Sequence, residues 1–135
     1  MPTAIQVSEA ASLALHSMVY IAGSGHDQVT VREISQIGQF SQAHLSKVLQ
    51  RLVKAGFLES SRGPKGGFRL ARPAGEISLL QIYENIEGPI ETQLCMNGSK
   101  QGVCPFERCI LSDLPQRLTS EFRAFLDSKR LSDYE

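Results

Sequence analysis

The stretch from residue 30 to residue 72 constrains the fold of this chain most, because it predicts two short helices, a tight turn and a hairpin in that order. Thr30-Val31-Arg32-Glu33 is a capping-box pattern, in which the Thr hydroxyl and the Glu carboxylate satisfy each other's unpaired backbone N–H groups. Gly38 allows a tight turn, and Ser41 is a good N-cap for the second helix, which Gly56 ends. The residues of the first of these helices that are expected to face inward are Val31, Ile34 and Ile37.

Two short strands with a turn between them follow the second helix. The strands are expected near Phe57–Ser61 and Gly67–Ala71, and residues 62–67 between them, RGPKGG, have the composition of a turn. Two helices joined by a tight turn and followed by a hairpin form a winged helix–turn–helix. The expected fold class is therefore mainly α with a small β-hairpin wing.

The second helix, over residues 41–54, has the two faces that a DNA-reading helix needs. Its buried face is formed by Leu45, Val48, Leu49 and Leu52. Its outer face is formed by Gln42, Ala43, His44, Lys47, Gln50, Arg51 and Lys54. Gln can bond adenine bidentately, and Lys can reach guanine or phosphate in the major groove. His44 is expected either to contact a base or to lie in solvent.

The hairpin adds a second set of basic side chains. Arg62 and Lys65 lie at its tip, with Arg69 and Arg72 on the returning strand. An arginine on such a tip suits a narrow A·T-rich minor groove, where the negative potential is strongest. Residues 30–72 carry eight Lys and Arg against two Asp and Glu, although the whole chain has a net charge of zero. This excess favours a polyanionic partner over the alternative, a solvated helix face and turn.

The remaining segments predict two helices that pack with the winged helix–turn–helix and one long C-terminal helix. A first helix is expected from Ser8 to about Ala22, and another from Ser78 to Ile86. A long final helix is expected to start near Pro105, with a kink or break at Pro115. The apolar side of that helix consists of Phe106, Ile110, Leu114, Leu118, Phe122, Phe125 and Leu126. Because the chain already has enough helices to fill a core, this stripe predicts an isologous homodimer.

The sequence predicts that the chain divides into three parts. Residues 1–87 form the winged helix–turn–helix domain, residues 88–104 a cysteine-bearing loop, and residues 105–135 the dimerisation helix and tail. No apolar run approaches the ~20 residues that span a bilayer, so no membrane association is expected. The start MPTAIQVSEA lacks the features of a signal peptide, which predicts a cytoplasmic protein. No glycine-rich phosphate loop or catalytic triad is visible, so no enzyme is expected.

All three cysteines of the chain, Cys95, Cys104 and Cys109, lie close together after the fourth expected helix. Their odd number and a reducing compartment argue against a structural disulfide. Thiolates are soft ligands that suit an iron–sulfur cluster or zinc, and a flexible loop leading into a helix could wrap one metal centre. Three unliganded thiols remain the alternative, because the spacing C-x8-C-x4-C lacks a CxxC pair.

The stretch VREISQIGQFSQAHLSKVLQRLVKAGFLESSRGPKGGFRLARP resembles the Rrf family of winged-helix regulators, of the IscR, NsrR and CymR type. The resemblance runs from the first helix to the last, and the wing RGPKGGFRLAR is its most specific part. It implies a homodimer joined by the long C-terminal helix and bound to double-stranded DNA at a palindromic operator. The second helix would enter the major groove and the wing the minor groove. The DNA contacts that it implies are Ser41, Gln42, Ala43, His44 and Lys47 on the helix, and Arg62 and Lys65 on the wing. Arg51, on the outer face of the same helix, is a further candidate DNA contact.

Family members that hold an iron–sulfur cluster place three cysteines in this loop, so the resemblance implies a cluster on Cys95, Cys104 and Cys109. The unequal spacing leaves [2Fe–2S] or [4Fe–4S] open. Where the fourth ligand comes from the first helix, often that of the partner subunit, the matching positions are Ser12 and, one turn later, His16, of which His16 suits iron. The alternative for His16 is a half-buried helix residue that is hydrogen-bonded locally, and Asp113 and Glu107 are the remaining local candidates for the ligand. The expected function is a regulator whose cluster senses redox, nitric oxide or iron–sulfur status. The alternative is a clusterless regulator controlled by thiol oxidation or a protein partner.

Overall fold

The computed structural model describes residues 5–91 and 105–135. The helices are α1 (Glu9–Gly23), α2 (Val31–Gly38), α3 (Gln42–Lys54), α4 (Leu79–Glu87) and α5 (Leu114–Ser128), with short 3₁₀ turns η1 (Ala74–Glu76) and η2 (Leu131–Tyr134). The strands β1 (Leu58–Ser61) and β2 (Gly67–Leu70) form an antiparallel pair. The order α2, α3, β1, β2 confirms the winged helix–turn–helix predicted from the sequence. None of the helices described here is long and apolar enough to cross a membrane.

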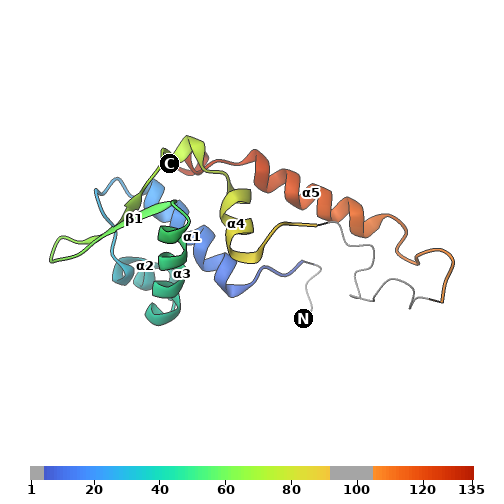
Figure 1. Ribbon diagram of the computed structural model, residues 1–135, viewed down its shortest axis with the longest axis horizontal. Coiled ribbons are helices and arrows are strands. Elements are labelled where there is room, and N and C mark those ends of the chain that lie inside the picture. Colours follow the sequence, from blue (N-terminus) through green and yellow to red (C-terminus); the bar gives the residue numbers. More distant parts are fainter. Residues whose placement is uncertain (1–4, 92–104) are drawn as a thin grey trace.

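The molecule consists of a head and an arm (Figure 1). Helices α1 to α4 form the head, the β1–β2 hairpin projects from one end of it, and α5 extends toward the opposite end. Helix α1 contacts α3, α4 and β2, and so lies at the centre of the head. The largest fully buried side chains in the core include Leu13, Met18, Leu45, Leu49, Leu52, Leu58, Ile77, Ile82 and Leu131.

The turn between α2 and α3 depends on a close approach between Gly38 and Phe40. Gln39 takes the left-handed conformation (φ 56°), and its N–H donates to the carbonyl of Ser35 to end α2. A Cβ on Gly38 would lie 2.1 Å from the Phe40 ring. The predicted role of Gly38 in a tight turn therefore has a steric cause, since the ring packs directly over its Cα.

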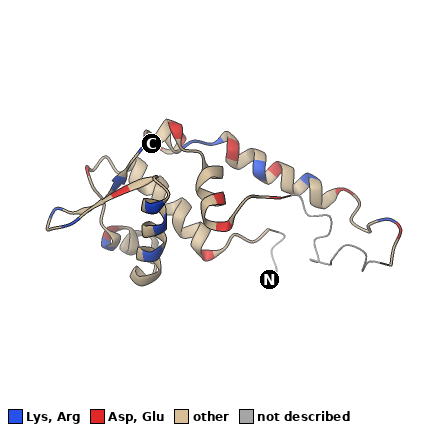
Figure 2. Cartoon of the chain, viewed as in Figure 1, with Lys and Arg blue, Asp and Glu red and all other residues tan. Residues whose placement is uncertain are grey.

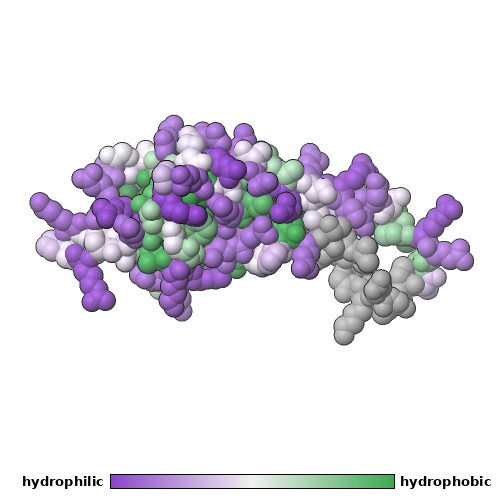
Figure 3. Space-filling model, turned by 45° about the horizontal axis from the view of Figure 1, so that its top comes forward, coloured by the Kyte–Doolittle hydropathy of each residue, from purple (hydrophilic) through white to green (hydrophobic). Residues whose placement is uncertain are grey.

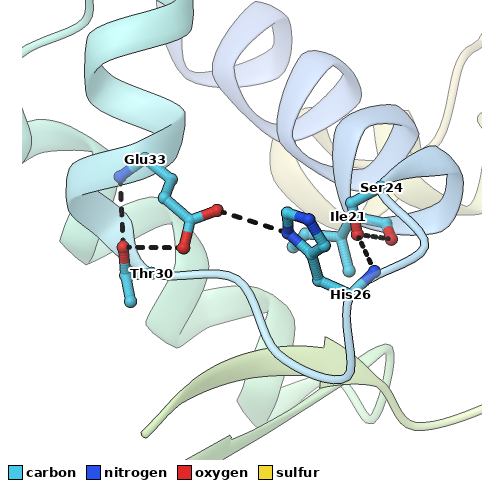
Figure 4. A network of polar contacts seen from close by, with 5 residues as sticks. All are labelled: Ile21, Ser24, His26, Thr30 and Glu33. Carbon is cyan, nitrogen blue, oxygen red and sulfur yellow. Dashed lines mark hydrogen bonds and ion pairs between the residues drawn. The ribbon is translucent and has the colours of Figure 1, made fainter. Parts of the chain in front are cut away.

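Two predictions for α2 are wrong in detail. The Thr30 hydroxyl accepts from the N–H of Glu33 at 3.1 Å, but the Glu33 carboxylate does not return to the backbone of Thr30. It lies instead between the Thr30 hydroxyl (3.4 Å) and the imidazole of His26 (3.8 Å), which draws the carboxylate away from the backbone of Thr30 (Figure 4). The expected inward-facing Ile37 is 64% exposed, since no described element covers the end of α2 there.

The wing is attached to the head by a third extended segment. Val29 forms an antiparallel bridge with Phe68 through two backbone hydrogen bonds of 2.9 and 2.7 Å. Beside it, the Ser61 hydroxyl donates to the Gln28 side chain at 2.7 Å. A Cβ on Gly67, whose φ is +154°, would lie 2.7 Å from the carbonyl oxygen of Val29. Only glycine therefore lets β2 approach Val29 this closely.

Helix α5 begins at Leu114, so the prediction of a start near Pro105 is wrong, whereas the expected break at Pro115 is confirmed. Pro115 occupies the first turn of α5, where its missing N–H costs nothing, whereas inside a longer helix it would clash with the preceding turn. Ser112, with φ 57°, also breaks any helix through residues 105–113. Phe106 and Ile110 consequently lie exposed in turns rather than on a helical stripe.

The arm is connected to the head by a contact between α4 and α5 and by the chain that follows α5. Tyr83 of α4 packs edge-on against Phe122 of α5, with ring centroids 5.4 Å apart. Partial burial and the negative charge of Glu87 raise the pKa of Tyr83 above its ordinary value, so the phenol stays neutral at this junction. After α5, Leu131 is fully buried and its N–H donates to the carbonyl of Ile77 at 3.0 Å, which returns the tail to the head.

Candidate nucleic-acid interface

Helix α3 presents an exposed polar face on a firmly buried base. Leu45, Leu49 and Leu52 are fully buried. The Ser41 hydroxyl caps the helix by accepting from the N–H of His44 at 3.4 Å. The predicted contact residues Gln42, Ala43 and Lys47, together with Gln50 and Lys54, are exposed. An anchored helix with this face outward has the form that enters a major groove.

The basic residues of α2, α3 and the wing fall into two groups. Arg69 pairs with Glu59 across the hairpin at 2.8 Å, and the guanidinium of Arg72 lies 4.8 Å from the centre of the Phe57 ring. Arg51 donates to the carbonyl of Ile86 at 3.0 Å. Within the described part of the chain, no carboxylate lies within ion-pair distance of the second group, which is Arg32, Lys47, Lys54, Arg62 and Lys65. Figure 2 shows these charges along α3 and at the hairpin tip.

His44 has a partner that the sequence did not indicate. Its Nδ1 lies 3.3 Å from the Glu9 carboxylate at the start of α1. Of the two sequence alternatives, a base contact or a solvent-exposed ring, neither includes this contact with a carboxylate. The carboxylate of Glu9 fixes the orientation of the ring at the N-terminal end of α3, which is the end that contacts bases in helix–turn–helix proteins.

The connection from α1 to α2 positions the wing, and nothing in the local sequence marks it. The Ser24 hydroxyl donates to the carbonyl of Ile21 and accepts from the N–H of His26, both at 3.2 Å (Figure 4). These contacts and the Glu33–His26 pair hold the loop that carries Val29 to β2. A bridge between residues so far apart in the sequence has no periodicity by which it could be predicted.

The structure tests only part of the predicted ligand set for a metal centre. Cys95 and Cys104 lie outside the described residues. Cys109 is exposed in the turns before α5, not one turn inside a helix as expected. Residues 5–91 and 105–135 contain no group of three His, Cys, Asp or Glu side chains placed to hold a metal ion.

His16 has the local hydrogen bonding of a potential metal ligand, but it belongs to α1, whereas Cys109 precedes α5. Its Nδ1 lies 2.7 Å from the carbonyl oxygen of Ser12, which can only accept, so Nδ1 carries the proton. In the neutral ring Nε2 then keeps a free lone pair, as in metal-binding histidines whose other nitrogen donates to a carbonyl. Helix α1 belongs to the head, however, and residues 105–113 lie at the far end of the arm (Figure 1).

The residues before α5 form an exposed apolar surface. Phe106 is 60% exposed and Ile110 80%, and Phe125 on α5 itself is 54% exposed. In the space-filling view, green atoms mark apolar side chains at the end of the arm (Figure 3). Large apolar side chains exposed on an extended arm are typical of an interaction surface.

A helix–turn–helix with an exposed, partly basic second helix, followed by a projecting basic hairpin, defines a winged-helix transcription regulator. The Rrf2 family, described as iron-dependent transcriptional regulators, matches residues 7–134. The chain belongs to this family.

Individual relatives agree with this assignment. The chain is 32% identical to the HTH-type transcriptional regulator IscR of Cereibacter sphaeroides, over 91% of this chain and 80% of that protein. It is 26% identical to the HTH-type transcriptional regulator NsrR of Bacillus licheniformis, over 89% of this chain and 85% of that protein. The crystal structure of CymR (YrzC), the global cysteine regulator of B. subtilis, superposes with a TM-score of 0.76 and 26% identity, covering 96% of this chain and 95% of that one. These relatives are transcriptional regulators and not enzymes.

Proposed function

We propose that this protein is a homodimeric repressor or activator that binds a palindromic operator and works in the cytoplasm, where that DNA lies. The observation that carries the proposal is the exposed face of α3, with Lys47 and Lys54 free of carboxylate partners among the described residues, next to a hairpin with Arg62 and Lys65 at its tip. Helix α3 enters the major groove and the hairpin the flanking minor groove. Two-fold symmetry of the dimer gives the operator its palindrome.

Selection from a random-sequence duplex library, followed by fluorescence anisotropy at several salt concentrations, tests DNA binding. We expect the parent protein to select a palindrome and its affinity to fall steeply with salt. Replacing Lys47 with glutamine should weaken binding and reduce the salt slope by about 1, because one phosphate contact is lost. Arg108→Gln, which removes the same charge at the other end of the molecule, should leave both unchanged. A parent protein that enriches no duplex would refute the proposal.

We further propose that α5 pairs with α5 of a second copy. A helix of 15 residues is marginal by itself, and α5 leaves Phe125 54% exposed, so a second apolar surface is needed to stabilise the arm. Replacing Phe125 with glutamate should convert the dimer into monomers in sedimentation velocity at micromolar concentration. DNA affinity should fall with it by about tenfold or more, since one half-site is lost. Ser120→Glu, on a different side of α5, should remain a dimer; equal behaviour of the two variants would contradict this pairing.

We infer that the cysteine segment holds an iron–sulfur cluster and is the sensing part of the regulator. The family description as iron-dependent and the exposed thiol of Cys109 support this. When bound, such a cluster supplies an iron centre that reacts with oxidants or nitric oxide. The polypeptide contributes the thiolates of Cys95, Cys104 and Cys109 and, from α1 of the partner subunit, the Nε2 of His16. The second candidate is direct oxidation of the same thiols or control by a protein partner, favoured by the exposure of Cys109.

A further inference from the structure

Arg51 joins the recognition helix to the end of α4. Its guanidinium, in the last turns of α3, donates to the carbonyl of Ile86 at 3.0 Å. Ile86 lies in the last turn of α4, where carbonyl groups have no partner within their own helix. A positive charge at this position also interacts favourably with the negative end of the helix dipole. If Arg51 turned away to reach a phosphate, the carbonyl of Ile86 would lose this partner.

The end of α4 is held by several other polar contacts. The hydroxyl of Ser8, the N-cap of α1, donates to the carboxylate of Glu87. The other carboxylate of this turn, Glu84, accepts from the N–H of Ile90 at 2.9 Å, and the N–H of Gly88 donates to the Glu84 carbonyl at 2.8 Å. The backbone leaving α4 is therefore tied to the same turn that receives Arg51.

At its other end α3 is tied to α1, through the pair between His44 and Glu9 at 3.3 Å. Because Ser8 and Glu9 are neighbours, the contacts form a closed ring of α3, α1 and α4. The end of α4 therefore contacts α3 directly through Arg51, and indirectly through α1 at the other end of α3. No comparable contact to α4 or α5 is present for Lys47 or Lys54 among the residues described.

We infer that Arg51 is a positioning residue, which sets α3 against the end of α4, rather than the DNA contact that its place on the outer face of α3 predicts. The inference rests on the proposed DNA binding. Since coupling between two sites is reciprocal, DNA bound to α3 must change the turn at Ile86, and a change at that turn must alter DNA affinity. Arg51 thus connects the DNA-reading helix to the point where the chain leaves α4 for the cysteine-bearing residues.

The test compares Arg51→Met and Arg51→Lys with Lys54→Met, which removes one charge from the same helix. Affinity for the selected duplex is measured against salt. Arg51→Met should bind at least about fivefold more weakly with an unchanged salt slope, whereas Lys54→Met should lower the slope by about 1, as expected for a lost phosphate contact. Arg51→Lys should not restore binding, because an ammonium cannot reproduce the planar guanidinium contact.

Amide exchange of the N–H groups of Gly88 and Ile90, measured by NMR, is the readout that a simple phosphate contact would not change. In free protein, Arg51→Met should accelerate both by about tenfold. Saturating duplex should slow both in the parent and in Lys54→Met, but not in Arg51→Met. Unchanged exchange in Arg51→Met, or a slope reduced by about 1 together with full rescue by Arg51→Lys, would overturn the inference. A parent protein that binds no duplex refutes the proposed function itself, whereas normal parent binding with either of these results refutes only the role of Arg51.

Discussion

Replacing Gly67 with alanine should weaken DNA binding by about tenfold or more, because the substitution displaces the wing from its attachment to Val29. The new Cβ would lie 2.7 Å from the carbonyl oxygen and 3.0 Å from the carbonyl carbon of Val29. Both are backbone atoms of a bridged residue, so the clash is relieved only by breaking the Val29–Phe68 bridge. The φ of +154° adds strain of about 2 kcal/mol for any residue with a side chain.

The expected consequence is a wing that no longer points at the flanking groove. Arg62 and Lys65 keep their charges but lose their fixed position relative to α3. Anisotropy with the selected duplex and a thermal melt measure the two effects, and the melting temperature should fall by several degrees. Gly75→Ala is the matched control, because the nearest atom to its new Cβ is 3.7 Å away. If Gly67→Ala binds like the parent protein, the attachment of the wing to Val29 has no role in recognition.

The hairpin and the two helices before it could be predicted from the sequence because their signals are local. Ser41 caps α3, and the turn composition of RGPKGG separates two strands near the expected residues. The register of these strands, with Leu58 opposite Leu70, comes from the structure alone. The attachment of that hairpin depends on Val29 and Gln28, which approach it only in the folded chain. In the sequence, Gly67 is one of several glycines at the predicted turn. Its close approach to Val29 is seen only in the folded chain, where the segment that contains Val29 lies beside β2.

The start of α5 shows how two local rules can compete. Proline is favourable in the first turn of a helix, and the sequence offers both Pro105 and Pro115. The apolar spacing from Phe106 to Leu126 favours the earlier start. The structure resolves the competition in favour of Pro115, since a helix from Pro105 would have to contain this proline in its interior. Spacing alone cannot detect that cost.

The candidate DNA contacts were predicted as a set, and their individual roles were not. A helical wheel places Lys47, Arg51 and Lys54 on one exposed face. Only the fold shows that Arg51 has a carbonyl partner in α4, and that His44 has a carboxylate partner in α1. A DNA contact therefore has to lie on the exposed face of the helix. That position alone does not distinguish a basic side chain without a protein partner from one that already contacts another part of the protein.

Replacing Cys109 with alanine should abolish the iron–sulfur cluster that we propose. A cluster with one thiolate removed loses an essential ligand, so after anaerobic reconstitution the variant should contain almost no iron or sulfide and should lack visible absorption. The parent protein should be coloured under the same conditions. Ser112→Ala, in the same turns, is the control and should be coloured as well. A colourless parent protein would refute the cluster, and a fully coloured Cys109→Ala would exclude Cys109 as a ligand.

His16 permits a sharper experiment, because α1 belongs to the head whereas residues 105–113 lie at the far end of the arm (Figure 1). Dimers that combine one Cys109→Ala subunit with one His16→Ala subunit can be isolated with two affinity tags. If His16 completes the site of the partner subunit, one of the two sites in the mixed dimer has both residues intact, and about half of the parent iron content should return. If the ligand came from the same protomer, neither site would be complete, and the mixed dimer should show no gain over its parent variants. Recovery of iron therefore distinguishes a site shared between two subunits from a site within one.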